Sequence, residues 1–278
     1  MRFKTIVIVF NTVIVLSFLF IFFVPLVLLG PDYFALFLSR NWIAGALFVA
    51  ALAAVNGYFV ANARLFGLLE TEDWPALVSY LETEVYQKGH VRAKQVRLLA
   101  NAYLVTSNAK ATKTLEEEVR RRRPGLVARL AVQFGIPHLL AADSEESERF
   151  FSTMVADRRV PGRDWLRWNH AFCLCRRGQR DRARDELQAL LLGVREPVLR
   201  LLVVYLLGTA CGEDGEARAA ALRGRDELRE RYPRPTWKRL VERSRSNLEA
   251  IVLSKVIEDA RSWLDEGAPS STADRTLD

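Results

Sequence analysis

The stretch WLRWNHAFCLCRRGQRDRARDELQALL, residues 165–191, predicts two short helices that break at Gly178. Within it, small and apolar side chains recur three or four positions apart, a spacing that brings residues to one face of a helix. These are Ala171 and Leu174 before the break and Ala183 and Leu187 after it. Two antiparallel helices would touch at these positions, so the stretch indicates a helical hairpin.

The hairpin is one copy of a repeat with a period of 35 to 37 residues. Small residues occupy one equivalent position in four copies: Ala100, Gly135, Ala171 and Gly208. Prolines occupy a second one: Pro124, Pro161, Pro197 and Pro233. Repeats of this length stack helix pairs, because a single pair cannot bury its apolar face. The sequence therefore predicts an all-α fold with repeats over residues 70–233.

The remaining helix pairs follow in register. They are expected at 91–108 with 110–123, at 126–141 with 144–158, and at 197–211 with 213–231. Residues 71–85 predict a second helix without a first one of its own. The end of the preceding apolar segment, 42–69, would supply that partner.

This pattern resembles the tetratricopeptide repeat (TPR). The residues that match its packing motif are Ala171, Leu174, Gly178, Ala183 and Leu187. The resemblance covers about residues 64–233 and implies a TPR-like α-solenoid. Glu116 and Gly224 depart from it, since a large apolar residue is expected at both positions, and no copy has the family's tryptophan in register. A generic α-solenoid is the alternative.

Two apolar segments precede the repeats and predict a transmembrane hairpin over residues 1–69. Residues 6–29 carry no charge over 24 positions. At 1.5 Å per residue, such a helix spans the roughly 30 Å of a bilayer core. A cleaved signal peptide would have an apolar region of only about 7 to 15 residues. Residues 42–69 predict the second helix, and residues 30–41 would form the turn.

Small and amide side chains are the candidates for packing within this hairpin. They are Asn11, Ala46, Ala50, Ala54, Asn56 and Asn62. The alanines recur every four residues, a spacing that lets helix backbones approach closely in lipid. Folding the segments back on each other brings the asparagines within about a turn of one another, and a hydrogen bond between such amides contributes about 1 kcal/mol.

Flanking charge sets the expected orientation. Arg2 and Lys4 precede the first segment and Arg64 closes the second, whereas Arg40 in the turn is accompanied by Asp32. The positive-inside rule then places both termini in the cytoplasm. The three cysteines, an odd number, give no disulfide framework and fit a reducing compartment. We therefore expect a multi-pass protein of a bacterial inner membrane.

After the repeats, residues 234–266 predict one or two charged helices with an apolar stripe. A cap is the default expectation for them, because the end of a solenoid needs a polar outer face. The alternative is a seam between two copies, a homodimer through residues 236–266. Residues 267–278, GAPSSTADRTLD, predict a disordered tail.

Composition and motifs disfavour several function classes. The net charge of +7 is spread over mixed charges, and only Arg120–Arg123 resembles the basic face of a nucleic-acid-binding protein. Cations at a helix C-terminus also complement the helix dipole. No nucleotide-binding loop, zinc motif or nucleophile motif occurs, and Cys173 and Cys175 point to nearly opposite sides of a helix. We expect no catalytic residue, metal, cofactor or nucleic-acid partner.

The TPR resemblance implies a concave surface, lined mainly by the first helix of each pair, that binds segments of other proteins. The candidate groove residues are Lys94, Arg97, Asn101, Arg129, Ile136, Trp165, Trp168, Phe172 and Tyr205. Arg97 and Asn101 match the beginning of the family's carboxylate clamp for peptide C-termini. Val105 and Trp165 stand where further basic clamp residues would be. What remains is an arginine-flanked aromatic groove, a composition enriched at interfaces.

These features predict a membrane-anchored scaffold or assembly factor that binds other proteins, themselves membrane-associated, at the lipid bilayer. Two membrane helices followed by TPRs also resemble the layout of the HemY-like proteins. That layout implies an alternative role in haem or porphyrin metabolism. A membrane-bound enzyme without a recognisable motif is a third reading.

Overall fold

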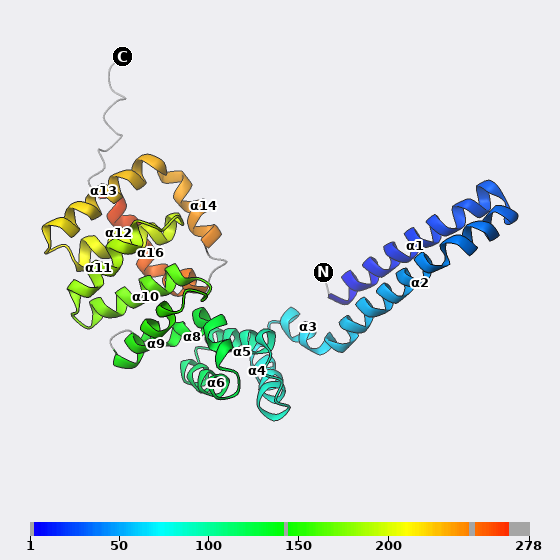
Figure 1. The fold of residues 1–278 in the computed structure, drawn as a ribbon, viewed down its shortest axis with the longest axis horizontal. Coiled ribbons are helices and arrows are strands. Elements are labelled where there is room, and N and C mark those ends of the chain that lie inside the picture. Colours follow the sequence, from blue (N-terminus) through cyan, green and yellow to red (C-terminus); the bar gives the residue numbers. More distant parts are fainter. Residues whose placement is uncertain (1–2, 142–143, 245–247, 267–278) are drawn as a thin grey trace, which may run out of the picture. The chain divides into compact units, whose positions relative to one another are not determined.

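The structure is a computed structural model that describes residues 3–141, 144–244 and 248–266. The described residues form 17 helices and no strand, which confirms the all-α class (Figure 1). They divide into two compact units, residues 1–89 and residues 90–278. The tail predicted at 267–278 lies outside the described residues.

The first unit opens with a helical hairpin. Helix α1 spans Phe3–Leu29 and α2 spans Pro31–Ala61, and the two lie side by side (Figure 1). A single residue, Gly30, makes the turn, with φ at 85°, a backbone conformation that glycine adopts without strain. Pro31 then starts α2, because its fixed φ suits the first helical position. The predicted turn over 30–41 is therefore wrong, and α2 begins eleven residues before position 42.

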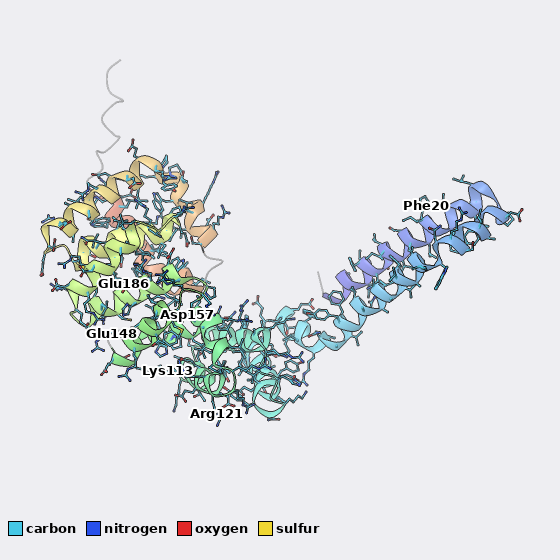
Figure 2. All side chains as sticks on the ribbon, viewed as in Figure 1. Phe20, Lys113, Arg121, Glu148, Asp157 and Glu186 are labelled. Carbon is cyan, nitrogen blue, oxygen red and sulfur yellow. The ribbon has the colours of Figure 1, made fainter. Side chains whose placement is uncertain are left out.

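Both hairpin helices are long and apolar enough to cross a membrane. The qualifying segments are Ile8–Leu28, with a mean hydropathy of 2.5, and Ser39–Ala61, with 2.0. Neither is buried by the rest of the chain. Phe20, labelled on α1 in Figure 2, is 73% exposed. Such exposure of large apolar side chains suits a lipid environment.

Amide and aromatic side chains join α1 to α2. Asn56 Nδ2 donates to Asn11 Oδ1 at 2.7 Å, and the rings of Phe18 and Phe48 stack with centroids 4.2 Å apart. Asn62 instead donates to the carbonyl of Tyr58 in its own helix.

The predicted alanines do not form the interface between α1 and α2. Gly45, Phe48, Leu52 and Asn56 are half-buried and form the face toward α1. The alanines, offset by one to two positions from that face, are all exposed: Ala46, Ala50 and Ala54. A helix turns by about 100° per residue, so this offset directs them away from α1.

A short helical pair completes the first unit. Helices α3 (Ala63–Glu70) and α4 (Trp74–Glu82) pack together, and a π-helical turn, η1 (Thr83–Gln87), follows. The Asp73 side chain caps α4 by accepting from the backbone N–H of Ala76 at 3.1 Å. The Arg64 guanidinium lies over the Tyr80 ring, 5.2 Å from its centroid. Residues after position 62 thus form a separate helix that packs on α4.

The second unit contains the helix array, which we define as helices α5 to α13. Its helices are α5 (Ala93–Val105), α6 (Ala109–Arg122), α7 (Pro124–Arg129), α8 (Ala131–Leu140), α9 (Glu145–Ala156), α10 (Arg163–Arg176), α11 (Arg180–Leu191), α12 (Pro197–Ala210) and α13 (Gly215–Arg231). Helices α5 and α6, α8 and α9, α10 and α11, and α12 and α13 pack as pairs. The helix predicted over 126–141 is broken at Leu130, which separates α7 from α8.

Small residues let the helices of a pair approach closely. A Cβ on Gly135 would lie 3.0 Å from the Phe151 ring. One on Gly224 would lie 2.8 Å from Val204 Cγ2, which explains why glycine replaces the large apolar residue expected there.

The second departure from the apolar pattern, Glu116, has a partner in the core. Its Oε2 lies 3.0 Å from His138 Nε2, and its Oε1 accepts from Arg120 at 2.5 Å. The His138 ring stacks on Phe150 with centroids 4.2 Å apart. A buried carboxylate is tolerated when it is hydrogen-bonded to a partner of this kind. Glu116 and His138 therefore join α6 to α8.

The C-terminal helices turn back over the array. Helices α14 (Arg234–Ser244) and α16 (Ser254–Asp265) pack on α12, and α15 (Leu248–Val252) packs on α8. The apolar side of α16 is buried within the same chain through Ile257, Ala260 and Leu264. This burial favours the capping role over a seam between two copies.

Gly224→Ala tests the close crossing of α12 and α13. The added Cβ would overlap Val204 and cost about 1–3 kcal/mol, more than the about 1 kcal/mol that alanine contributes through helix propensity. We expect a lower midpoint of thermal unfolding. Gly125→Ala is the matched control, because nothing lies within 4 Å of its Cβ position.

In a Val204→Ala background the overlap is removed, so Gly224→Ala should then raise the unfolding midpoint. The same destabilisation in both backgrounds would contradict the proposed contact.

Candidate functional site

The basic residues of the predicted concave surface are exposed. Lys94 and Arg97 on α5 and Arg129 on α7 are exposed, and Asn101 is half-buried. Ile136 on α8 is buried, with 2% of its surface accessible. The basic part of the predicted groove is therefore at the surface.

The predicted aromatic part is not open. Trp168 is fully buried and stacks on Phe172 with centroids 5.3 Å apart. Trp165 is 6% exposed, and its indole N–H donates to Glu196 at 2.8 Å. Both tryptophans pack inside the array, because they join α10 to its neighbours. This corrects the expectation that they face a partner.

Tyr205 is covered by the returning helix α16. Its ring meets Trp263 edge-on, with centroids 5.9 Å apart. Trp263 also fills the space beside Gly208, where a Cβ would lie 3.1 Å from the indole. The Arg225 guanidinium lies 5.0 Å from the Trp263 ring. Burial, with the carboxylates of α16 and of the residue after it, raises the pKa of the Tyr205 phenol.

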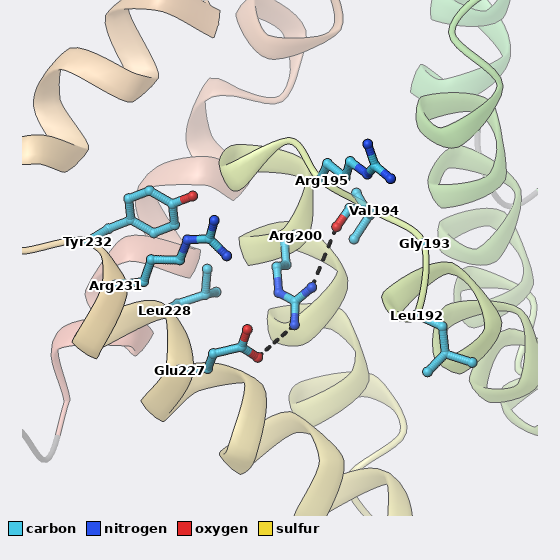
Figure 3. A pocket seen from close by; sticks show the side chains of 9 residues that line it. All are labelled: Leu192, Gly193, Val194, Arg195, Arg200, Glu227, Leu228, Arg231 and Tyr232. Carbon is cyan, nitrogen blue, oxygen red and sulfur yellow. Dashed lines mark hydrogen bonds and ion pairs between the residues drawn. The ribbon is translucent and has the colours of Figure 1, made fainter.

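The α11–α12 loop and the end of α13 border a hollow in the surface. A cavity of about 430 Å³ opens between the α11–α12 loop and the end of α13 (Figure 3). It is lined by Leu192, Gly193, Val194, Arg195, Arg200, Glu227, Leu228, Arg231 and Tyr232. Three arginines and one glutamate make this lining positively charged.

The orientation of Arg200 is fixed by three acceptors. Its guanidinium donates to Glu227 Oε2 at 2.7 Å and to the carbonyls of Leu191 and Val194 at 3.5 Å, and Figure 3 shows the bonds to Glu227 and Val194. The Arg231 guanidinium points into the hollow in the same view, 5.7 Å from the Tyr232 ring centroid. A preformed arginine suits a carboxylate or a phosphate.

A second cavity of about 750 Å³ adjoins the first. The two share Leu192, Arg200 and Glu227, so they form one groove, which we call the α11–α13 groove. This part is lined by the small and apolar residues Ala189, Leu191, Ala220 and Gly224 and by the polar residues Asp185, Gln188, Glu216 and Arg223. Leu192, at the rim, is 91% exposed. A groove with an apolar strip and a basic end can bind a protein segment that carries apolar and acidic side chains.

The histidines of the array are core residues. His170 Nδ1 lies 2.5 Å from Glu186 Oε2, and His138 is held by Glu116 as described above. Within the part of the chain that the structure describes, no three His, Cys, Asp or Glu side chains are placed to hold a metal ion.

The sequence does carry a signal for the basic end of the groove. An arginine precedes each of the four repeat prolines by two residues: Arg122, Arg159, Arg195 and Arg231. We call this set the arginine ladder. Its last two members line the same cavity although they are 36 positions apart. Laying the repeats on one another would therefore have found them.

The fold and groove define an all-helical protein with two N-terminal helices of membrane-spanning length. The chain belongs to the family described as "Uncharacterised Treponema protein", whose profile matches residues 111–266. A Treponema pallidum (strain Nichols) protein, named "Uncharacterized protein", is 31% identical over 232 residues. That alignment covers 78% of this chain and 73% of the relative. No solved structure matches the chain.

Trp263→Ala tests how firmly α16 is held on α12. The change removes the contacts with Tyr205, Gly208 and Arg225, and we expect it to lower the free energy of unfolding by about 2 kcal/mol. Limited proteolysis should then cleave α16 earlier. Ser262→Ala, at an exposed neighbouring position, is the control. Equal protease resistance of both variants would contradict this role of Trp263.

Proposed function

We propose that this protein is a membrane-anchored, TPR-like scaffold or assembly factor that binds other proteins at the cytoplasmic face of a bacterial inner membrane. The α11–α13 groove is the observation that carries the proposal. It combines apolar walls with a basic end, and Leu192 at its rim is almost fully exposed. The exposed leucine adds apolar surface that a partner segment can cover.

The hairpin supports the anchoring part of the proposal. Helices α1 and α2 are long enough to span a bilayer, and their lipid-facing side chains are apolar. Lys4 and Arg64 flank the hairpin on one side, and Asp32 offsets Arg40 near the turn. Positive charge prefers the cytoplasmic side, so both termini and the helix array would lie in the cytoplasm.

The groove favours one kind of partner segment. Its walls leave room for an extended or helical segment with small apolar side chains, and its end offers Arg200, already oriented by Glu227. A carboxylate on the segment would complement Arg200, which lines both parts of the groove. The HemY-like alternative rests on layout alone, and haem or porphyrin binding by the purified protein would favour it.

The topology is tested with a reporter fused after Asp278. A fluorescent protein that matures only in the cytoplasm should be bright there, because an even number of membrane helices returns the chain to the side where it began. Its counterpart, a phosphatase active only outside the cytoplasm, should be inactive at the same position. The opposite pair of results would overturn the cytoplasmic placement.

Partner binding is tested by photocrosslinking in cells. A crosslinker at Ala189 should capture a specific polypeptide, and Ala220→Arg should reduce the yield about tenfold, because it fills the groove with a charged side chain. Leu222→Arg is the matched control, since Leu222 lies on the same helix but lines a different cavity. Equal loss with both variants, or no loss with either, would contradict binding in the groove.

A further inference from the structure

The arginine ladder lies along one edge of the helix array. All four of its residues are exposed, and each is in or beside a loop that joins one helix pair to the next. The two helices of each packed pair are joined by a short turn, which places these turns at one end of the pairs and the connections between pairs at the other.

Contacts between the loops agree with this placement. A Cβ on Gly162, in the loop before α10, would lie 3.2 Å from Val132 at the start of α8. Trp165 at the start of α10 is bonded to Glu196 in the next loop. Arg195 and Arg231, from two successive loops, line one cavity. The loops therefore follow one another along a continuous surface.

The two edges of the array carry opposite charge. The ladder edge comprises residues 119–124, 156–162, 192–197 and 229–234, with ten arginines and three acidic residues. The opposite edge, at 106–110, 144–146, 176–181 and 211–216, has four basic and six acidic residues. Helix dipoles do not account for this difference, because each edge contains both N-terminal and C-terminal helix ends.

Cations close to the opposite edge form ion pairs with carboxylates of a neighbouring helix pair. Lys113 pairs with Glu146 at 2.8 Å, and Arg180 pairs with Glu213 at 2.6 Å, so each ion pair links two helix pairs. On the ladder edge, Arg120, Arg121 and Arg122 pair with glutamates of their own helix, Arg229 pairs with Asp226, and Arg234 pairs with Asp265. Arg159 and Arg195 present exposed side chains. The ladder thus leaves a net positive surface for an external anion.

An exposed apolar side chain lies among these arginines. Leu192 precedes Arg195 by three residues in the same loop and is 91% exposed. Arginine combined with an exposed leucine is typical of surfaces that bind the interface of an anionic membrane. The guanidinium group also binds phosphate through two parallel hydrogen bonds.

We propose that the arginine ladder docks the helix array on anionic lipid headgroups, with Leu192 at the acyl boundary. The cavity between Arg195 and Arg231 receives a headgroup phosphate. The inference rests on the membrane anchoring proposed above, because the hairpin keeps the array at high effective concentration beside the bilayer. The lipid is then a second contact of the array, distinct from the protein segment in the apolar part of the groove.

The test uses the full chain reconstituted in nanodiscs without any partner protein. One set contains phosphatidylcholine alone, and the other also contains phosphatidylglycerol. Hydrogen–deuterium exchange should slow about tenfold in loops 157–162 and 193–196 only with the anionic lipid, since basic groups bind anionic surfaces electrostatically. Added salt should reverse the effect. The turns at 106–108 and 178–180 should exchange equally in both.

A quadruple variant removes the ladder charges: Arg122→Gln, Arg159→Gln, Arg195→Gln and Arg231→Gln. It should lose the protection while remaining in the nanodisc. The matched control changes four exposed cations at or near the opposite edge: Lys110→Gln, Arg149→Gln, Arg176→Gln and Arg218→Gln. It should retain the protection. Circular dichroism confirms that both variants stay helical.

The outcomes separate the lipid contact from the anchor. Equal exchange of the ladder loops in both lipids, with the chain retained in the discs, overturns the lipid docking and leaves the anchoring proposal standing. Loss of protection in both quadruple variants also overturns it, because a specific edge is then not required. Salt-sensitive binding to anionic discs alone, without insertion in neutral ones, supports the ladder and overturns the hairpin anchor.

Discussion

The close crossing of helices within a pair is the constraint on which the helix array depends. Phe151 packs on Gly135, Val204 packs on Gly224, and larger side chains at these glycines would push the helices apart. Gly224 also lines the α11–α13 groove. The close crossing of α12 and α13 therefore sets the position of one wall of that groove.

Much of the fold could be predicted from the sequence because packing leaves a periodic trace. The small residues from Ala100 to Gly208 recur at nearly constant spacing, and helix pairs occur there. Features that depend on a single contact have no periodic pattern in the sequence and could not be predicted from it. The apolar stripe of α16 suits a cap or a dimer seam equally well, and periodicity does not distinguish the two. Likewise, the sequence predicts a turn over residues 30–41, whereas the structure turns at Gly30 alone and residues 31–41 are helical.

The candidate site was harder to predict because it depends on side-chain direction. Trp165 and Trp168 are three apart on α10, and spacing alone does not show which of them faces solvent. In the structure Trp165 is bonded to Glu196 and Trp168 stacks on Phe172, and both are buried. The basic residues on α5 were correctly expected at the surface, since charged side chains resist burial. The spacing of the arginine ladder can be read from the sequence. That its four residues lie along one edge of the array depends on the arrangement of the loops, which the spacing does not give.

The buried pair of Glu116 and His138 has a consequence for assembly. Repeated helix pairs present similar apolar surfaces, so a chain of them can dock in the wrong order while it folds. A carboxylate in an apolar interface is costly unless it meets its own partner, and His138 lies in the adjacent pair. A misordered docking would separate Glu116 from His138, and only the bond to Arg120 of the same helix would be kept from the pair of contacts described above. The pair thus favours the observed order of helix pairs over other orders, at the cost of some apolar contact in the interface.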